Sequence, residues 1–83
     1  MSVVTDLLKP DNVADARNVP CPGPILSLKK AITSVEIGQI LELQATDKGA
    51  HEDVPAWARK TGQLYLGVSA REGYDSHFIQ RQK

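Results

Sequence analysis

Three prolines, each separated from the next by one residue, constrain this chain more than any other feature of its sequence. Pro20, Pro22 and Pro24 flank Cys21, the only cysteine of the chain. Proline fixes φ and has no backbone N–H, so this segment is stiff and cannot join a β-sheet. Proline is favoured as the first residue of a helix, because the N–H that it lacks would have no partner there. The segment therefore predicts a helix that begins at Pro24 with Gly23 as its cap, and it leaves Cys21 just outside.

The pattern after Pro24 is helical. Apolar residues recur at spacings of three and four, and polar residues fill most positions between them. The apolar stripe consists of Ile25, Leu28, Ile32 and Val35. A second helix is predicted over residues 50–61, and Gly62 is a natural C-terminal stop. The inward face of this second helix consists of Val54, Trp57 and Ala58.

The remaining segments predict strands at residues 13–17, 39–46, 63–71 and 76–81. Residues 39–46 alternate, with Leu41, Leu43 and Ala45 on the buried face. In residues 63–71 we expect Leu64, Leu66, Val68 and Ala70 to face inward, and Tyr65, Ser69 and Arg71 to lie on the uncovered face.

The order of these elements predicts the fold class. Strands joined through helices should pair in parallel by right-handed crossovers, and the last two should form an antiparallel hairpin. Alternating strands indicate that only one face of the sheet is covered. We therefore expect an α/β (α+β) two-layer sandwich of order βαβαββ, with a four-stranded mixed sheet and two helices on one face.

Length and composition limit the kinds of protein that this chain can be. Its 83 residues predict one domain with a modest core. Ten basic residues balance ten acidic ones, so no net charge would attract nucleic acid or an anionic membrane. A single cysteine cannot form an internal disulfide, and no segment reads as a signal peptide or a membrane span. We expect a cytoplasmic protein.

The position of Cys21 suggests a reactive thiol. A lone cysteine is often an inert buried hydrophobe. Cys21, however, lies just ahead of a helix N-terminus, whose dipole favours the thiolate and lowers the thiol pKa moderately. The chain offers no resolving cysteine, and no histidine lies close to Cys21 along the sequence, so disulfide cycling and Cys–His hydrolysis are not indicated. The remaining reaction is attack on sulfur, in which the thiol accepts a sulfur atom as a persulfide and passes it on.

Two blocks of sequence resemble the TusA/SirA-like family of sulfur-carrier proteins. The first is Cys21-Pro22-Gly23-Pro24, a Cys-Pro-X-Pro signature preceded by Asp15-Ala16-Arg17. The second is Asp47, Asp53-Val54-Pro55 and Trp57, followed by Gly62. Asn18 stands where the family usually has glycine, but asparagine can adopt the same positive-φ turn. The resemblance covers roughly residues 13–82, and we expect a carrier domain over residues 13–83 with residues 1–12 as an N-terminal extension.

The resemblance implies a sheet of order 1-2-4-3 and a persulfide on Cys21. It implies partners that donate sulfur, such as a cysteine desulfurase or a rhodanese, and a protein that accepts it, such as one of DsrE type. It implies no cofactor and no enzymatic turnover beyond sulfur transfer. Two alternatives stay open. The first is a redox-regulatory thiol that forms mixed disulfides with a partner, and the second, less favoured, is an RNA-binding module.

Several residues around Cys21 are candidates for supporting roles. Pro22, Gly23 and Pro24 shape the thiol loop. Arg17 is the nearest cation in sequence and could offset the charge of Asp47, which by itself would raise the thiol pKa. Lys29 and Lys30 lie about 12 Å away along the helix, so a solvated face is expected there. His51 and His77 lie far apart in the sequence with no cysteine nearby, so no metal site is expected.

Overall fold

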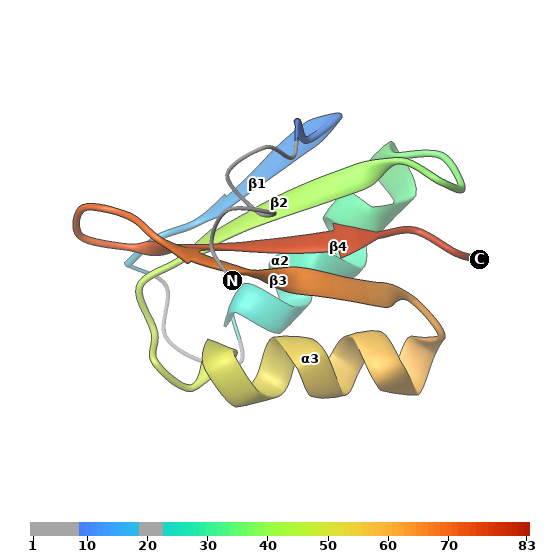
Figure 1. Ribbon diagram of the computed structural model, residues 1–83. Helices are drawn as coiled ribbons and strands as arrows, with labels where there is room; N and C mark the ends of the chain where they lie inside the picture. The colour runs from blue at the N-terminus through green and yellow to red at the C-terminus, as the bar shows by residue number, and fades with distance from the viewer. Residues whose placement is uncertain (1–8, 19–22) are drawn as a thin grey trace.

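The computed structural model describes residues 9–18 and 23–83 (Figure 1). Cys21 and Pro22 therefore lie outside the described residues, as do Val19 and Pro20. In chain order the described elements are β1 (Asn12–Ala16), α2 (Gly23–Ala31), the 3-10 helix η1 (Ile32–Ser34), β2 (Ile40–Ala45), α3 (Ala50–Thr61), β3 (Leu64–Ala70) and β4 (Asp75–Gln80).

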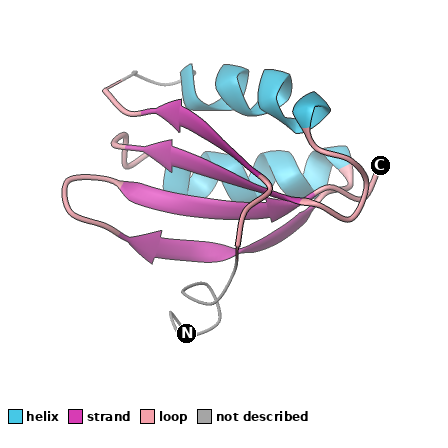
Figure 2. Ribbon diagram, turned by 90° about the horizontal axis from the view of Figure 1, so that it is seen from above, coloured by secondary structure: helices cyan, strands magenta, loops and turns pink. Residues whose placement is uncertain are grey.

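The strands form one mixed sheet of order β1-β2-β4-β3. β1 pairs with β2 in parallel, and β4 pairs antiparallel with both β2 and β3. Both helices lie on the same face of the sheet (Figure 2). The predicted two-layer sandwich and its strand order are confirmed.

The predicted helices match the structure closely. α2 begins at Gly23, one residue before the predicted start, and Pro24 is buried in its first turn. Leu28 is fully buried, and the stripe continues past the end of α2 through Ile32 and Val35, because η1 extends the helical path. A difference of one residue at a helix end is within the usual ambiguity of helix boundaries.

α3 covers the other half of the sheet. Its buried residues are Ala50, Val54 and Ala58, whereas Trp57 is half-buried and packs against the core. Gly62 ends the helix in the left-handed conformation at φ 80°, and its N–H bonds to the carbonyl of Ala58. A side chain at this position would be strained by the positive φ, which explains the glycine.

The core lies between the helices and one face of the sheet. Leu41 and Leu43 of β2 are fully buried there beside Ile79 of β4. Leu41 and Ile79 are cross-strand partners, so their side chains lie on the same face. The alternation predicted for β2 is confirmed on this face.

The predicted face assignment of β3 is wrong at its beginning. Leu64 is 47% exposed, whereas Tyr65 packs against the core. A β-bulge explains the change: Tyr65 pairs with Ile79 and Gly67 with Phe78, so Leu66 is an extra residue on this strand. Such a bulge shifts the alternation by one residue, so a strict period of two misassigns the residues before it.

The face of the sheet opposite the helices also holds buried groups, contrary to the prediction that only one face would be covered. Phe78 is 1% exposed there, and Ser76, Ser69 and Glu42 are buried as well. The Glu42 carboxylate accepts hydrogen bonds from the Ser76 hydroxyl at 2.9 Å and from the Gln44 amide at 3.0 Å. These bonds compensate for the loss of water around the carboxylate, which makes its burial tolerable.

Candidate functional site

The chain segments on either side of residues 19–22 lie at one edge of the sheet. Ala16, Ala45 and Asp75 pair in a single row across β1, β2 and β4. β1 and β2 end at this row, and β4 begins there. Since α2 follows β1 and α3 follows β2, both helices begin at this edge, which we call the carboxyl edge. Loops at the carboxyl ends of parallel strands are a common location for functional sites in α/β folds.

Asn18, which directly precedes residues 19–22, is held in place by its backbone. Its φ is 64°, so the predicted positive-φ conformation is confirmed. Its backbone N–H donates to Oγ1 of Thr46 at 2.8 Å. This bond ties the end of β1 to the connection between β2 and α3. The Asp47-Lys48-Gly49 loop, which follows Thr46 directly, therefore lies on the same side of the sheet as the end of β1.

Arg17 makes a two-pronged ion pair with Asp15. Its Nε and Nη2 donate to the two carboxylate oxygens at 2.9 and 3.0 Å, and its backbone N–H adds a bond of 3.1 Å. The side-chain and backbone hydrogen bonds from Arg17 lower the pKa of Asp15 to about 2, and the ion pair raises the pKa of Arg17. We expected Arg17 to offset Asp47, but the structure pairs its guanidinium with Asp15 instead.

The guanidinium of Arg17 also lies over an aromatic ring. Its central carbon is 5.4 Å from the centroid of Tyr74, a distance that allows a cation–π attraction. Tyr74 belongs to the turn between β3 and β4. Arg17 therefore links the end of β1 to the β3–β4 turn, a contact that the sequence pattern did not predict.

Asp47 organises the start of α3. Its carboxylate accepts the backbone N–H of Gly49 at 3.0 Å, and its carbonyl accepts the N–H of Ala50 at 3.1 Å. These bonds form the local turn from which the helix begins. Gly23 is half-exposed and Pro24 buried at the start of α2, while Lys29 and Lys30 are exposed in its last turn.

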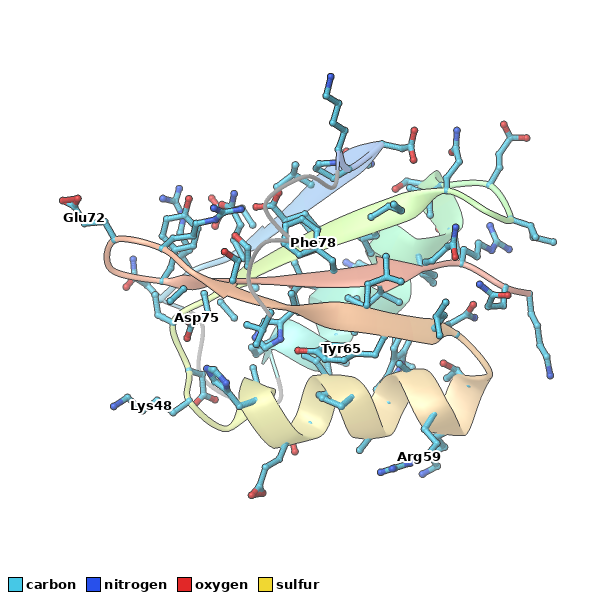
Figure 3. The ribbon with its side chains drawn as sticks, in the orientation of Figure 1. Lys48, Arg59, Tyr65, Glu72, Asp75 and Phe78 are labelled. Atoms are coloured by element: carbon cyan, nitrogen blue, oxygen red, sulfur yellow. The ribbon has the colours of Figure 1, made fainter. Side chains whose placement is uncertain are left out.

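The sequence pattern missed a polar cluster that consists of His51, Tyr65, Asp75 and His77. The cluster reaches from Asp75 at the carboxyl edge to Tyr65 near the other end of β3. Nε2 of His51 lies 2.8 Å from a carboxylate oxygen of Asp75, and the rings of His51 and His77 meet edge to face with centroids 5.4 Å apart. Figure 3 shows Asp75 and Lys48 at the end of the sheet where α3 begins, and Tyr65 between the sheet and α3. The two histidines that are far apart in the sequence are therefore neighbours in space.

His77 is fully buried between the sheet and α3. Its Nδ1 lies 2.9 Å from the Tyr65 hydroxyl. Burial lowers the pKa of His77 to about 4, with a further lowering from His51 and an opposing effect of Asp75. Burial also raises the pKa of Tyr65 to about 12, and the charge of Asp75 adds to this. Both side chains are therefore neutral at neutral pH. The only signal for this cluster in the sequence was the position of His77 on the alternating face that it shares with Ile79.

The part of the chain that the structure describes contains no group of three metal-ligating side chains. None of its helices combines the length and the apolar character that a bilayer crossing requires.

Comparison with known proteins places this architecture in a family. The family described as "Sulfurtransferase TusA" matches residues 12–81. The "Putative sulfur carrier protein YrkI" of Bacillus subtilis is 51% identical over 59 residues, which are 71% of this chain and 79% of that protein. The "Sulfur carrier protein TusA" of Allochromatium vinosum is 41% identical over 69 residues, 83% of this chain and 90% of that protein.

Two further matches extend the comparison. The "Putative sulfur carrier protein YrkF" of Bacillus subtilis is 40% identical over 75 residues, 90% of this chain, but the match spans only 40% of that longer protein. The crystal structure of a SirA-like protein from Desulfitobacterium hafniense superposes with a TM-score of 0.74 at 19% identity, over 87% of this chain and 99% of that one. The chain belongs to the TusA/SirA-like family of sulfur carrier proteins.

Proposed function

We propose that this protein holds sulfur as a persulfide on Cys21 and relays it from a donor protein to an acceptor protein. The donor would be a cysteine desulfurase or a rhodanese, and the acceptor a protein of DsrE type. Pro22, Gly23 and Pro24 would shape the loop that presents the thiol. In this proposal the chain is a cytoplasmic carrier without a cofactor, and its only chemistry is sulfur transfer.

The proposal rests on one observation, which is that the described residues on either side of residues 19–22 are fixed at the carboxyl edge. On one side, Asn18 bonds to Thr46 and Arg17 is held by Asp15. On the other side, α2 begins at Gly23 with Pro24 buried. Cys21 precedes the first residue of α2 by two positions in the sequence, and a helix N-terminus favours a thiolate that lies near it.

The reaction needs little more than an accessible thiol. The Cys21 thiolate would attack the outer sulfur of a donor persulfide, and the donor would leave as a thiolate. A second attack, by a thiolate of the acceptor, would remove the sulfur again. Neither step requires an external oxidant or reductant, because the transferred sulfur keeps its oxidation state.

Mass spectrometry of the intact protein tests this function. The protein is incubated with a cysteine desulfurase and cysteine, or with a rhodanese and thiosulfate. A mass gain of one sulfur atom that reductant reverses, and that Cys21→Ser abolishes, is the expected result. A mixed disulfide or a sulfenic acid on Cys21 in place of the persulfide would favour the redox-regulatory alternative.

RNA binding is the weaker alternative. RNA-binding sheets display stacking aromatics on an open face. Here the aromatic residue on the helix-free face, Phe78, is buried, and the buried carboxylate of Glu42 lies beside it. Salt-sensitive binding of single-stranded RNA that survives Cys21→Ser would contradict the carrier proposal.

A further inference from the structure

The charged side chains are unevenly distributed between the two ends of the sheet, although the net charge of the chain is zero. The segments at the carboxyl edge carry three basic residues, Arg17, Lys48 and Arg71, among a larger number of acidic ones. The acidic residues there are Asp15, Asp47, Glu52, Asp53, Glu72 and Asp75. This end of the molecule is therefore acidic.

The opposite end of the sheet is basic. Both helices begin at the carboxyl edge, so their last turns lie at the other end, and the residues that follow β4 lie there as well. α3 alone, with 12 residues, separates the two ends by about 18 Å. Figure 3 shows Arg59 toward the end of α3 that lies away from Lys48, Glu72 and Asp75. We define the basic end by six residues, which are Lys29, Lys30, Arg59, Lys60, Arg81 and Lys83.

Residues 81–83 are fixed against the ends of both helical segments. Nη1 of Arg81 donates to the carbonyl of Val35, which follows η1, at 2.6 Å. The backbone N–H of Gln82 donates to Oε1 of Gln63, which follows α3, at 2.6 Å. The Lys83 side chain lies against Gly62, because a β-carbon added there would come within 2.9 Å of Cε and 3.1 Å of Nζ. The cations of three separate segments are thereby held at one end of the molecule.

These cations lie without acidic partners. All of the basic end except Arg81 is exposed, and within residues 9–18 and 23–83 no ion pair joins any of its members to a carboxylate. A helix dipole favours a cation near each helix C-terminus. Further cations at the same place repel one another, so their number is more than helix stability requires. A concentration of unpaired charge of one sign is suited to a partner of opposite charge.

An exposed apolar side chain lies next to these cations. Ile37 is 67% exposed, in the turn between η1 and β2. The N–H of the next residue, Gly38, donates to the carbonyl of Arg81 at 2.7 Å, so this turn lies directly beside residues 81–83. Protein–protein interfaces commonly combine an apolar contact with a polar or charged rim. Ile37 and the basic end together have this composition.

From this arrangement we infer that the basic end is a docking surface for an acidic protein, with Ile37 as its apolar contact. The partner surface carries carboxylates around an apolar residue. The inference does not depend on the proposed sulfur transfer. A partner bound here leaves the carboxyl edge uncovered, where Asn18 and Gly23 flank residues 19–22.

Two other polyanionic partners fit this surface less well. Proteins that bind single-stranded nucleic acid stack its bases on aromatic side chains, and none of the six residues of the basic end is aromatic. Proteins that lie on an anionic membrane insert an extended apolar face, whereas the apolar contact identified here is a single isoleucine. A protein surface needs neither feature.

Titration with a synthetic acidic peptide, followed by NMR of the ¹⁵N-labelled protein at low salt, tests the inference. The peptide carries one central leucine flanked by glutamates, and a second peptide carries serine in its place. We expect amide shifts concentrated at residues 36–38, 59–63 and 81–83, and tighter binding of the leucine peptide. Lys60→Gln should weaken binding by about two- to fourfold, because one exposed ion pair contributes modestly. Ile37→Ser should remove the preference for leucine.

The chain offers a matched control for each variant. Lys48→Gln removes the same charge at the carboxyl edge, and the affinity of this variant should remain within about 1.5-fold of the wild type. Leu26→Ser removes another exposed apolar side chain, 56% exposed in α2, and the preference for leucine should persist in it. Circular dichroism of each variant checks the fold. If Lys60→Gln unfolds, Lys30→Gln replaces it.

Poly-uridine RNA and vesicles of phosphatidylglycerol are titrated in parallel, so that each outcome decides. Shifts at the basic end that weaken in Lys60→Gln but not in Lys48→Gln, with a preference for leucine that Ile37→Ser removes, support the docking surface. Shifts spread over the molecule, equal losses in Lys60→Gln and Lys48→Gln, or no binding of either peptide would overturn it. Tighter binding of the RNA or of the vesicles than of the leucine peptide would also overturn it, because the surface would then select another polyanion.

Discussion

The backbone N–H of Asn18 donates to Oγ1 of Thr46 at 2.8 Å, across 28 positions of sequence. This one bond joins the segment that precedes the thiol loop to the segment that precedes α3. It brings the two βα connections together, and His51 follows in the first turn of α3.

Asn18 should be replaceable by glycine but not by alanine. Its φ of 64° is readily adopted by glycine and tolerated by asparagine, whereas other residues pay a steric penalty there. Asn18→Ala should lower the free energy of unfolding by about 1 kcal/mol. Asn18→Gly should change it by less than about 0.5 kcal/mol. Urea unfolding measures both, and equal stability of the two variants would contradict the role of the left-handed conformation.

The protein should lose stability as the pH falls from about 6.5 to about 4. His77 has a pKa of about 4 in the folded protein because it is buried, against 6.5 for an unperturbed histidine. Below pH 6.5 the unfolded chain therefore binds a proton that the folded protein does not, and this favours unfolding progressively until the folded His77 is protonated as well. Thermal unfolding at intervals between pH 7 and pH 4 measures the effect.

His77→Gln provides the control for this acid sensitivity. Glutamine can still bond to Tyr65 but does not titrate, so the loss between pH 6.5 and 4 should shrink in the variant even if its stability at pH 7 is lower. The contribution of Asp15, whose pKa is about 2, is lost only at more acid pH and does not obscure the comparison. An unchanged slope in His77→Gln would show that another group is responsible.

Tyr65 should ionise later than an ordinary tyrosine. Burial and the nearby Asp75 raise its pKa to about 12 from the usual value of 10, so folding should weaken above pH 10, where the unfolded chain begins to lose the proton that the folded protein retains. Tyrosinate absorbance during an alkaline titration should show a late step that Tyr65→Phe removes. If the late step persists in that variant, it belongs to another residue.

Phe78 should stabilise the protein as strongly as a residue under the helices. It is 1% exposed although it lies on the opposite face of the sheet. Phe78→Ala should lower the free energy of unfolding by about 3–5 kcal/mol, and Phe78→Leu by about 1 kcal/mol. Leu26→Ala, at a position that is 56% exposed, is the matched control and should cost less than about 1 kcal/mol. A cost for Phe78→Ala close to that of the control would show that this face contributes little.

Much of the fold could be predicted from local patterns. The apolar stripe from Ile25 to Val35 predicted the first helix, because a helix places every third or fourth residue on one side. Proline at position 24 and glycine at position 62 predicted helix ends within one residue, because their backbone restrictions act at the residue itself. The strand order 1-2-4-3 came from resemblance to a family, and the structure confirms it.

Predictions failed where a residue depended on a distant partner. The face of Tyr65 was misassigned because a bulge at Leu66 shifts the strand against β4, and a pattern of alternation contains no information about register. Arg17 pairs with Asp15 and Tyr74 where Asp47 was expected. The division into an extension over residues 1–12 and a domain over residues 13–83 stays a prediction, as does the role of Cys21, which lies outside the described residues.

The sequence by itself therefore determined the elements, their ends, the fold class and the one thiol that the chain can offer. These follow from torsional limits and from the periodic burial of apolar side chains, which act within a few residues. Only the tertiary structure decided that His51 meets Asp75 across 24 positions, that His77 lies buried beneath it, and that Phe78 and Glu42 are buried on the second face. Such contacts depend on how strands align and where loops bring them together, and the energies that select them arise only when the whole sheet is assembled.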